Sequence, residues 1–248
     1  MKIQVCGYGF VGKAHALALE SNHDVHVYDP AKDRIDFDGA ADAVVIAVST
    51  PMQADGSCDV SNVIDCISMV EPGIPILIKS TISLEGWDTI NRTYSNVSFS
   101  PEYLRAQHAM EDFKNQSTIW VGGGDTSFWS DLLRTSLGVS INIVTAEELI
   151  IAKYTRNSFL ALKVAFFNQV FDLCEASGVD YDSVAKLVTF DDRVGSSHTV
   201  VTAERGFGGH CFPKDTAAFV ESGRVSKSET IMTILKEAIE YNDRIRKK

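Results

Sequence analysis

The sequence predicts an α/β protein in two parts: a parallel β-sheet covered by helices, followed by a mostly helical part with one long helix. Short apolar runs bounded by turn residues alternate with helical patterns in the first half of the chain. Beyond Thr145, apolar residues keep a helical spacing for roughly thirty residues without proline or internal glycine. A chain of 248 residues, 45% of them hydrophobic, can bury the cores of both parts.

Seven apolar runs predict the strands of the sheet, and three stretches between or after them predict helices. The strands are expected at 2–6, 24–28, 43–48 and 74–79, with shorter candidates at 97–100, 118–122 and 141–144. The helices are expected at 11–21, 60–70 and 85–94. Strands that alternate with helices in this way are typical of a parallel sheet.

The second part is predicted to be helical from Ala146 onward. Its first helix would run to Gly178, a residue that suits the C-terminal cap of a helix. Further helices are expected at about 181–190 and 230–246. We therefore expect a domain boundary near Thr145, between a domain of residues 1–145 and a domain of residues 146–248.

The composition argues against several classes of function. The formal net charge of −10 argues against a general nucleic-acid surface, because phosphate binding of that kind needs a basic patch. The apolar runs are too short to span a membrane, and the chain begins with a strand pattern instead of a signal peptide, so we expect no membrane partner and a cytoplasmic location. The five cysteines include no C-x-x-C pair, so neither a metal site nor a disulfide framework is expected.

A glycine-rich turn follows the first predicted strand. Gly7, Gly9 and Gly12 of GYGFVG precede a predicted helix, and Asp29 comes at the end of the second predicted strand. Such glycines let a pyrophosphate approach the helix N-terminus, and the acid can accept hydrogen bonds from the adenosine ribose. This context favours dinucleotide binding over a chance glycine turn, and Asp29 favours NAD over NADP because it disfavours a 2′-phosphate.

One cysteine lies in a loop rich in glycine and charge, GFGGHCFPKD, residues 206–215. A thiolate is a better nucleophile than a thiol, and a nearby cation such as Lys214 or Lys153 would favour the thiolate at Cys211. Taken alone, the loop also allows an inert, packed thiol. Lys153 and Asn157 are four residues apart and would share one face of the long helix, either as active groups or as part of a solvated polar stripe.

Motifs along nearly the whole chain resemble the nucleotide-sugar dehydrogenase family, and most closely its UDP-glucose 6-dehydrogenase branch. In the order of the family they are GYGFVG, VYDPAKDRI, VVIAVSTPMQADGSCDVS, IKSTI, SPEYLR, KYTRNSFLALKVAFFNQ, DDRVG and GFGGHCFPKDT. The last motif is very specific. The resemblance implies a Rossmann-like dinucleotide-binding domain, followed by a mostly helical dimerisation domain that carries the catalytic cysteine.

The activity implied by the resemblance is an NAD-dependent, four-electron oxidation of the C6 alcohol of a nucleotide sugar to a carboxylate, with UDP-glucose to UDP-glucuronate as the first candidate. Cys211 matches the nucleophile, which would form a thiohemiacetal with the intermediate aldehyde and then a thioester. Arg193 matches an arginine that reaches the substrate of a neighbouring subunit. The implied partners are therefore the nucleotide-sugar substrate and a second copy of the chain in a homodimer.

The resemblance also implies roles for individual residues. Lys153 and Asn157 would hold the developing oxyanion, and Asp215 would orient water or the lysine. Glu102 would serve proton transfer in hydrolysis, with Thr81 beside the reacting centre. The implied cofactor-binding residues are Gly7, Gly9, Phe10, Val11, Gly12, Asp29, Arg34, Thr50, Pro51, Ser80 and Thr81. The implied substrate-binding residues are Glu102, Tyr103, Leu104, Arg105, Lys153, Asn157, Arg193, Phe207, Gly208 and Gly209.

Three departures from the family pattern keep other functions open. Ala106 stands where the family usually has a second glutamate, the segment from Arg34 to Ala43 is short, and the chain ends at KEAIEYNDRIRKK, where relatives continue into another α/β domain. One alternative is a catalytically weak NAD-binding or assembly subunit. Another is a two-electron 3-hydroxyacid-type dehydrogenase, against which the cysteine argues because that chemistry has no use for a thiol nucleophile.

Overall fold

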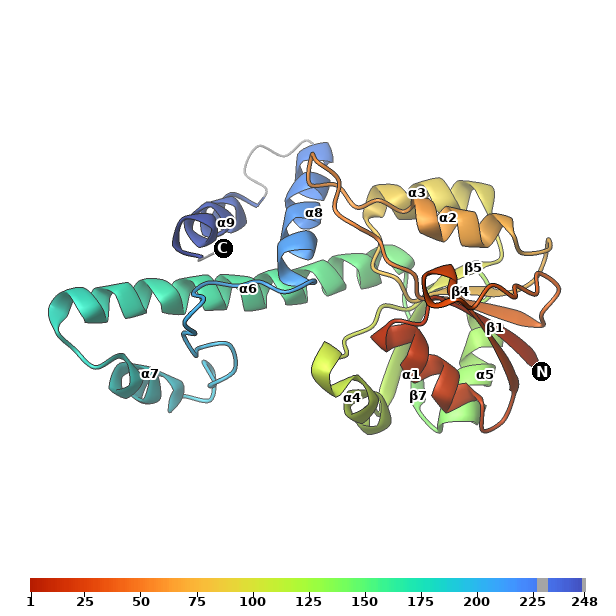
Figure 1. Cartoon of the computed structure of the whole chain (residues 1–248), viewed down its shortest axis with the longest axis horizontal. Coiled ribbons are helices and arrows are strands. Elements are labelled where there is room, and N and C mark those ends of the chain that lie inside the picture. The colour runs from red at the N-terminus through yellow and green to blue at the C-terminus, as the bar shows by residue number, and fades with distance from the viewer. Residues whose placement is uncertain (227–231, 247–248) are drawn as a thin grey trace. The chain divides into compact units, whose positions relative to one another are not determined.

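The computed structural model describes residues 1–226 and 232–246, and the chain forms two compact units (Figure 1). Unit 1 consists of Met1–Gln53 and Cys58–Lys153, and unit 2 consists of Ala54–Ser57 and Tyr154–Lys248. The predicted domain boundary near Thr145 lies where helix α6 (Ala146–Ser177) begins, whereas the division between the units falls inside that helix.

Unit 1 is built on a seven-stranded sheet in the order β2-β1-β3-β4-β5-β6-β7. All seven runs predicted as strands are confirmed, with small shifts at their ends. The strands are β1 (Lys2–Cys6), β2 (Asp24–Tyr28), β3 (Ala43–Ile46), β4 (Ile76–Ile78), β5 (Val97–Phe99), β6 (Thr118–Gly123) and β7 (Ser140–Ile143). β1, β3, β4 and β5 are buried almost throughout, as expected for strands covered on both faces.

One pair of strands departs from the expected parallel sheet. β5 and β6 are antiparallel, whereas the other neighbouring strands are parallel. The chain between them forms a short 3-10 turn (Ala106–His108) and helix α4 (Ala109–Asn115). This connection begins and ends at the same edge of the sheet, so β6 runs back beside β5.

Helices cover both faces of the sheet. α1 (Phe10–Leu19) and α5 (Thr126–Leu137) lie on one face, and α2 (Ser61–Ser68) and α3 (Leu84–Thr93) lie on the other (Figure 1). The side chains of α1 and α5 pack with those of the sheet in one apolar cluster, which includes Ile3, Val5, Leu19, Val45, Leu77, Trp129 and Leu133. This packing fixes the start of α1 directly after β1, where the glycine-rich turn lies.

The sequence prediction missed α4 and α5. α5 nevertheless carries ordinary end signals, because the Asp125 carboxylate accepts a hydrogen bond from the Phe128 backbone N–H at 3.0 Å. Its other end is Gly138, which has a left-handed φ of 66°. These two residues could have located the helix from the sequence.

Unit 2 is helical over most of its described residues. Its elements are the greater part of α6, followed by α7 (Tyr181–Thr189), α8 (Phe212–Val225) and α9 (Thr233–Ile245). The long helix is confirmed and ends before Gly178, whose φ is 66°. α9 confirms the last predicted helix within the described residues, although positions 230 and 231 lie outside them. α8 was not predicted, although Pro213 in its first turn is a helix-start signal.

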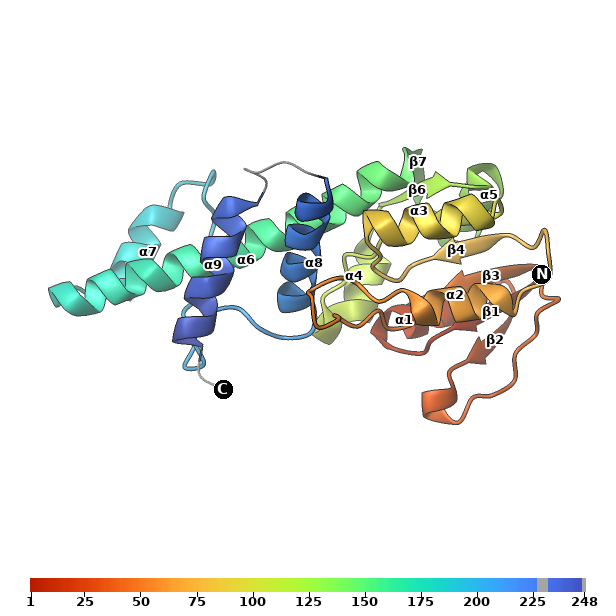
Figure 2. The ribbon, with the colours of Figure 1, turned by 90° about the horizontal axis from the view of Figure 1, so that it is seen from above.

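Helices α7, α8 and α9 lie beside α6 (Figure 2). Two apolar clusters of side chains hold them there. One joins Phe167 and Cys174 of α6 to Tyr181 of α7. The other joins Ala161 and Ala165 of α6 to buried Phe207, with partly buried side chains packed around them: Val164, Phe212, Ala238, Ile239 and Tyr241. Within the described residues, no helix is both long and apolar enough to cross a membrane.

Candidate active site

The glycine-rich turn between β1 and α1 needs two of its glycines for the fold and leaves space at the third. A Cβ at Gly7, where φ is 87°, would lie 2.5 Å from the Ala47 carbonyl oxygen, and a Cβ at Gly12 would lie 1.9 Å from the Gly7 carbonyl oxygen. A Cβ at Gly9 would meet nothing within 4 Å. Gly9 is also the N-cap of α1 and supplies no side-chain cap, so the N-terminus of the helix is open to a ligand.

Asp29 is held against this turn. Its carboxylate accepts a hydrogen bond from the Tyr8 backbone N–H at 2.7 Å. The Arg34 guanidinium lies over the Tyr8 ring, 4.3 Å from its centroid, and the Lys32 ammonium donates to the Tyr8 carbonyl oxygen. An open helix N-terminus with an acid beside it fits a dinucleotide, whose pyrophosphate and ribose need these two groups. Sequence reasoning singled out Asp29 and Arg34 but missed Lys32.

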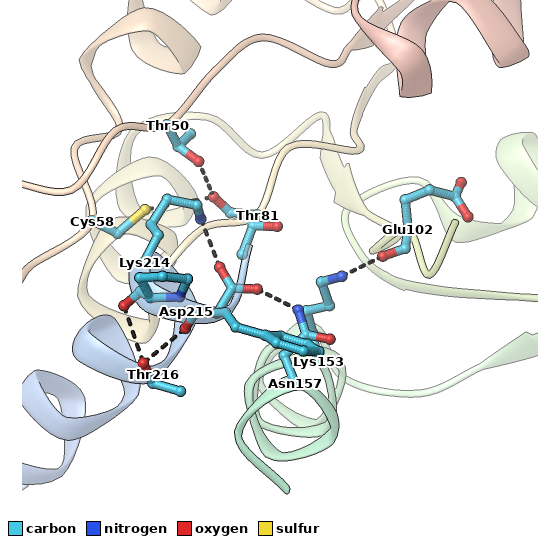
Figure 3. A network of polar contacts seen from close by, with 11 residues as sticks. Thr50, Cys58, Thr81, Glu102, Lys153, Asn157, Lys214, Asp215 and Thr216 are labelled. Carbon is cyan, nitrogen blue, oxygen red and sulfur yellow. Dashed lines mark hydrogen bonds and ion pairs between the residues drawn. The ribbon is translucent and has the colours of Figure 1, made fainter. Parts of the chain in front are cut away.

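The loops after β3 and β4 are tied together at the carboxyl ends of the strands. The Thr50 hydroxyl donates to the Thr81 carbonyl oxygen at 2.7 Å (Figure 3), and the Ser80 hydroxyl donates to the Val48 carbonyl oxygen at 2.7 Å. The Cys58 thiol also points to the Thr81 carbonyl, at 3.5 Å. In open parallel sheets this edge is where ligands bind. The loops therefore present four of the implied cofactor residues together: Thr50, Pro51, Ser80 and Thr81.

A buried carboxylate lies at the centre of unit 1. One oxygen of Glu102 is 3.1 Å from Nε2 of His15 and 3.3 Å from Nζ of Lys79, and the side chains of these three residues are 7%, 0% and 1% exposed, respectively. Its other oxygen accepts the Tyr103 backbone N–H at 3.0 Å. Lys79 also donates to the Ser100 hydroxyl at 3.0 Å. The Glu102 carboxylate therefore has three partners and links α1 and the residue after β4 to the chain after β5.

Burial and the neighbouring charges determine the protonation of Glu102 and His15. Burial by itself raises the pKa of the Glu102 carboxyl, but the charge of Lys79 and the hydrogen bond from His15 outweigh it and hold that pKa well below its ordinary value. Burial and the Lys79 charge lower the pKa of His15. Burial also lowers the pKa of Lys79, against the Glu102 charge, which raises it. At neutral pH the Glu102 carboxyl is therefore ionised and the His15 imidazole is neutral. The sequence analysis missed His15 and Lys79, although a lysine at the end of a buried strand signals the need for an anionic partner.

Glu102 also positions Lys153 through its backbone. The Lys153 ammonium donates to the Glu102 carbonyl oxygen at 2.6 Å and lies 5.3 Å from the centroid of the Tyr103 ring (Figure 3). Lys153 is buried, in the part of α6 that belongs to unit 1. The main-chain carbonyl thus holds the Lys153 ammonium in place, and a cation held in this way can stabilise negative charge.

A second buried acid lies in unit 2. Asp215 is 1% exposed, accepts a hydrogen bond from the Asn157 side-chain amide at 2.5 Å and pairs with the Lys214 ammonium at 2.7 Å (Figure 3). Its backbone N–H donates to the Cys211 carbonyl oxygen at 2.8 Å, at the first turn of α8. Cys211 is the N-cap of α8 and is exposed, whereas Cys6, Cys58, Cys66 and Cys174 are buried. Exposure at a helix N-terminus is the environment expected of a reactive thiol.

Other residues implied by the sequence differ in their surroundings. Phe207 is buried, whereas Gly209 is exposed with a left-handed φ of 76°. Arg105 pairs with Asp112 at 2.6 Å and is largely exposed. Arg193, whose side chain is 89% exposed, pairs with Asp191 two residues before it. Within the described residues, no group of three or more His, Cys, Asp or Glu side chains is arranged to hold a metal ion.

The chain matches two domains of one protein family. Residues 38–134 match the NAD binding domain of the UDP-glucose/GDP-mannose dehydrogenase family, and residues 145–244 match its central domain. The UDP-glucose 6-dehydrogenase of Rickettsia felis is 34% identical over 82% of this chain, which corresponds to 48% of that relative. The chain therefore spans about half the length of this curated relative.

Several solved structures have a fold similar to that of this chain. A UDP-glucose dehydrogenase from the archaeon Pyrobaculum islandicum matches with a TM-score of 0.83 and 29% identity, over 98% of this chain and 68% of that one. A 3-hydroxyisobutyrate dehydrogenase of Mycobacterium tuberculosis matches with a TM-score of 0.74 and 18% identity, over 98% of this chain and 92% of that one. The second likeness is one of fold alone. The predicted α/β fold with a Rossmann-like domain and one long helix is confirmed.

The turn at β1 predicts opposite outcomes for two glycine-to-alanine substitutions. Gly12→Ala should disrupt the folding of unit 1, because its methyl group would lie 1.9 Å from a backbone oxygen. Gly9→Ala should fold normally but bind NAD at least about tenfold more weakly, because the methyl group would fill the space next to the helix N-terminus. Circular dichroism and calorimetric titration with NAD measure the two effects. Wild-type NAD affinity in Gly9→Ala would contradict the assignment of this turn.

Proposed function

The chain belongs to the UDP-glucose/GDP-mannose dehydrogenase family, and from this premise we propose that it oxidises the C6 alcohol of a nucleotide sugar to a carboxylate, with UDP-glucose as the first candidate substrate. The observation that carries the proposal is the exposed Cys211 at the start of α8, one helical turn before the buried Asp215. A thiol in that position serves a reaction with a covalent intermediate.

The glycine-rich turn and the acid beside it would hold the cofactor. NAD, when bound, supplies the hydride acceptor for both oxidation steps. Gly7, Gly9 and Gly12 would admit its pyrophosphate to the N-terminus of α1, and Asp29 would face the ribose. Phe10, Val11, Arg34 and the residues at the ends of β3 and β4 would complete the contact.

The cysteine explains how an alcohol can be taken to the acid in one site. The alcohol first loses a proton and a hydride to give an aldehyde. The Cys211 thiolate then forms a C–S bond to the aldehyde carbon, and the resulting thiohemiacetal again carries a C–H bond that can lose a hydride. The thioester formed in this way is cleaved by water, which releases the carboxylate and restores the thiol.

The buried polar residues would stabilise the charges that develop on the substrate. We assign the Lys153 ammonium and the Asn157 amide, one turn apart on α6, to the developing oxyanion. Asp215 would orient Asn157, to which it is hydrogen-bonded, and Lys214. Thr81 would lie beside the reacting carbon. We also assign Glu102 to proton transfer in hydrolysis, as the family resemblance implies.

The remaining family positions would bind the sugar and the nucleotide. Tyr103, Leu104 and Arg105 follow Glu102, and Phe207, Gly208 and Gly209 precede Cys211. Ala106, which stands in place of a family glutamate, favours as a second candidate an NAD-binding or assembly subunit with little catalytic activity of its own.

The stoichiometry of the reaction tests the proposed function. Incubated with NAD and a panel of nucleotide sugars, the protein should release about two NADH for each sugar oxidised, because a thioester is formed after the aldehyde. Absorbance of NADH and mass analysis of the product measure this. One NADH per molecule, with a ketone or aldehyde product, would favour a two-electron hydroxyacid-type reaction. No turnover with any sugar, with NAD still bound, would favour the assembly subunit.

We also propose a homodimer formed through unit 2. Phe159, Phe166 and Leu173 recur every seven residues on α6, and they are 63%, 59% and 66% exposed. A spacing of seven residues places them on one face of the helix. A second copy of the chain would cover this apolar stripe and bring the exposed Arg193 to its neighbour's substrate. A cytoplasmic location suits the reaction, since Cys211 must stay reduced, and cell fractionation would test it.

The apolar stripe predicts how the oligomer responds to substitution. Light scattering at micromolar concentration should give at least the mass of a dimer for the wild type. Phe166→Glu should give a monomer, because it places a charge within the apolar stripe, whereas Glu175→Lys, at an exposed position of α6 outside the stripe, should not. A monomeric wild type that retains activity would remove the argument for the dimer and for the role of Arg193.

A further inference from the structure

Two buried asparagines hold the loop that carries Cys211. They are Asn168 on α6 and Asn242 on α9, which are 1% and 4% exposed. We infer that they are positioning residues: their side-chain oxygens fix the backbone at Gly206 and Phe207, and so set the place of the Cys211 thiol. The inference rests on the proposed function for the role of the thiol, but the geometry of the loop stands independently of it.

Asn242 of α9 accepts a hydrogen bond from the backbone of the loop. Its side-chain oxygen receives the Phe207 backbone N–H at 2.6 Å. The same oxygen would lie 2.3 Å from a Cβ at Gly206, so only a glycine allows the loop to come this close to the amide. The contact is buried, and a main-chain N–H left without an acceptor there would be strongly unfavourable.

Asn168 of α6 accepts a hydrogen bond from the backbone N–H of Gly206, the residue before Phe207. Its side-chain oxygen accepts the Gly206 backbone N–H at 3.1 Å and the Arg205 Nε–H at 2.8 Å, while its own amide donates to the Val164 carbonyl oxygen at 2.9 Å. Arg205 has a left-handed φ of 61°, which is unusual for a residue with a side chain. The hydrogen bonds that the Asn168 oxygen accepts therefore hold a strained backbone, which would relax if the amide were removed.

The loop is anchored on both sides of the cysteine. Phe207 is buried in the apolar cluster of α6, and Phe212 packs against the same cluster immediately after Cys211. Beyond it, the Thr216 hydroxyl donates to the Phe212 carbonyl oxygen at 2.7 Å in the first turn of α8. Only the short segment 208–211 lies between the anchors. A shift at Gly206 or Phe207 is therefore passed to the thiol over a few bonds.

Sub-ångström placement of a nucleophile matters for its rate, because a misplacement of about 1 Å can reduce a rate on the order of a hundredfold. Two of the four loop residues between the anchors are Gly208 and Gly209, which add flexibility. The two amides act together with the Arg246 guanidinium, which donates to the Arg205 carbonyl oxygen at 3.0 Å, to select one conformation of the loop. Both asparagines lie in stretches that resemble the family, but the sequence analysis gave neither a role, since neither adjoins the cysteine.

Substitution of Asn242 tests the inference in the full chain. Asn242→Leu removes the acceptor with little change in volume, and we expect kcat to fall about tenfold to a hundredfold while KM and the NAD dissociation constant stay within about threefold. Asn242→Asp keeps an oxygen acceptor and should retain most of kcat. Ile239→Val, which trims a side chain packed on the same cluster of unit 2, is the control for lost stability alone.

Hydrogen exchange separates this inference from the proposed function. The peptide that covers residues 204–211 should exchange at least about tenfold faster in Asn242→Leu than in the wild type, and at nearly the wild-type rate in Asn242→Asp and Ile239→Val. This readout needs no substrate, so it holds even if no nucleotide sugar is oxidised. Unchanged exchange in Asn242→Leu, or an equal loss of kcat in Asn242→Leu and Ile239→Val, would overturn the positioning role.

Discussion

The ion pair between Glu102 and Lys79 is the constraint on which unit 1 depends. Both side chains are buried, so neither charge is tolerable without the other, and removal of one partner from such a pair typically costs about 3–5 kcal/mol of stability. The carboxylate also faces His15 of α1. The helix that starts at the glycine-rich turn and the chain that follows β5 are therefore held to one another. The Glu102 carbonyl oxygen also accepts a hydrogen bond from Lys153. Glu102 therefore connects α1, which starts at the proposed cofactor site, to the candidate catalytic cation Lys153.

The two acids of the candidate site use burial differently. Glu102 is surrounded by a cation, an imidazole and a backbone N–H, which keep it ionised and in place. Asp215 is paired with the amide of Asn157 and the ammonium of Lys214, and it lies one turn into the helix that starts after Cys211. Around each acid, polar groups are preorganised by their own unit. Preorganised dipoles and charges of this kind need little rearrangement when a substrate develops charge.

Much of the fold could be read from local patterns. The seven strands and the long helix follow from runs of apolar residues with a clear period, and Gly178 marks the end of α6. The antiparallel β6 could not be read in this way, because a strand's direction is set by the path of the preceding connection. In the site, GFGGHCFPKD identified Cys211 and Asp215. His15, Asn168 and Asn242 stayed hidden because their partners are distant in sequence: His15 meets Glu102 and Asn242 meets Phe207.

The central claim is that Cys211 bonds to the substrate during oxidation, and trapping that bond tests it most directly. The wild-type protein is incubated with NAD and UDP-glucose, quenched in acid within a turnover and analysed by intact mass spectrometry and peptide mapping. The account predicts an added mass of the sugar nucleotide on residue 211, absent from Cys211→Ala, which should still fold and bind NAD. A wild-type protein that forms the uronic acid without an adduct, together with a Cys211→Ala variant that forms it at the same rate, would contradict the account.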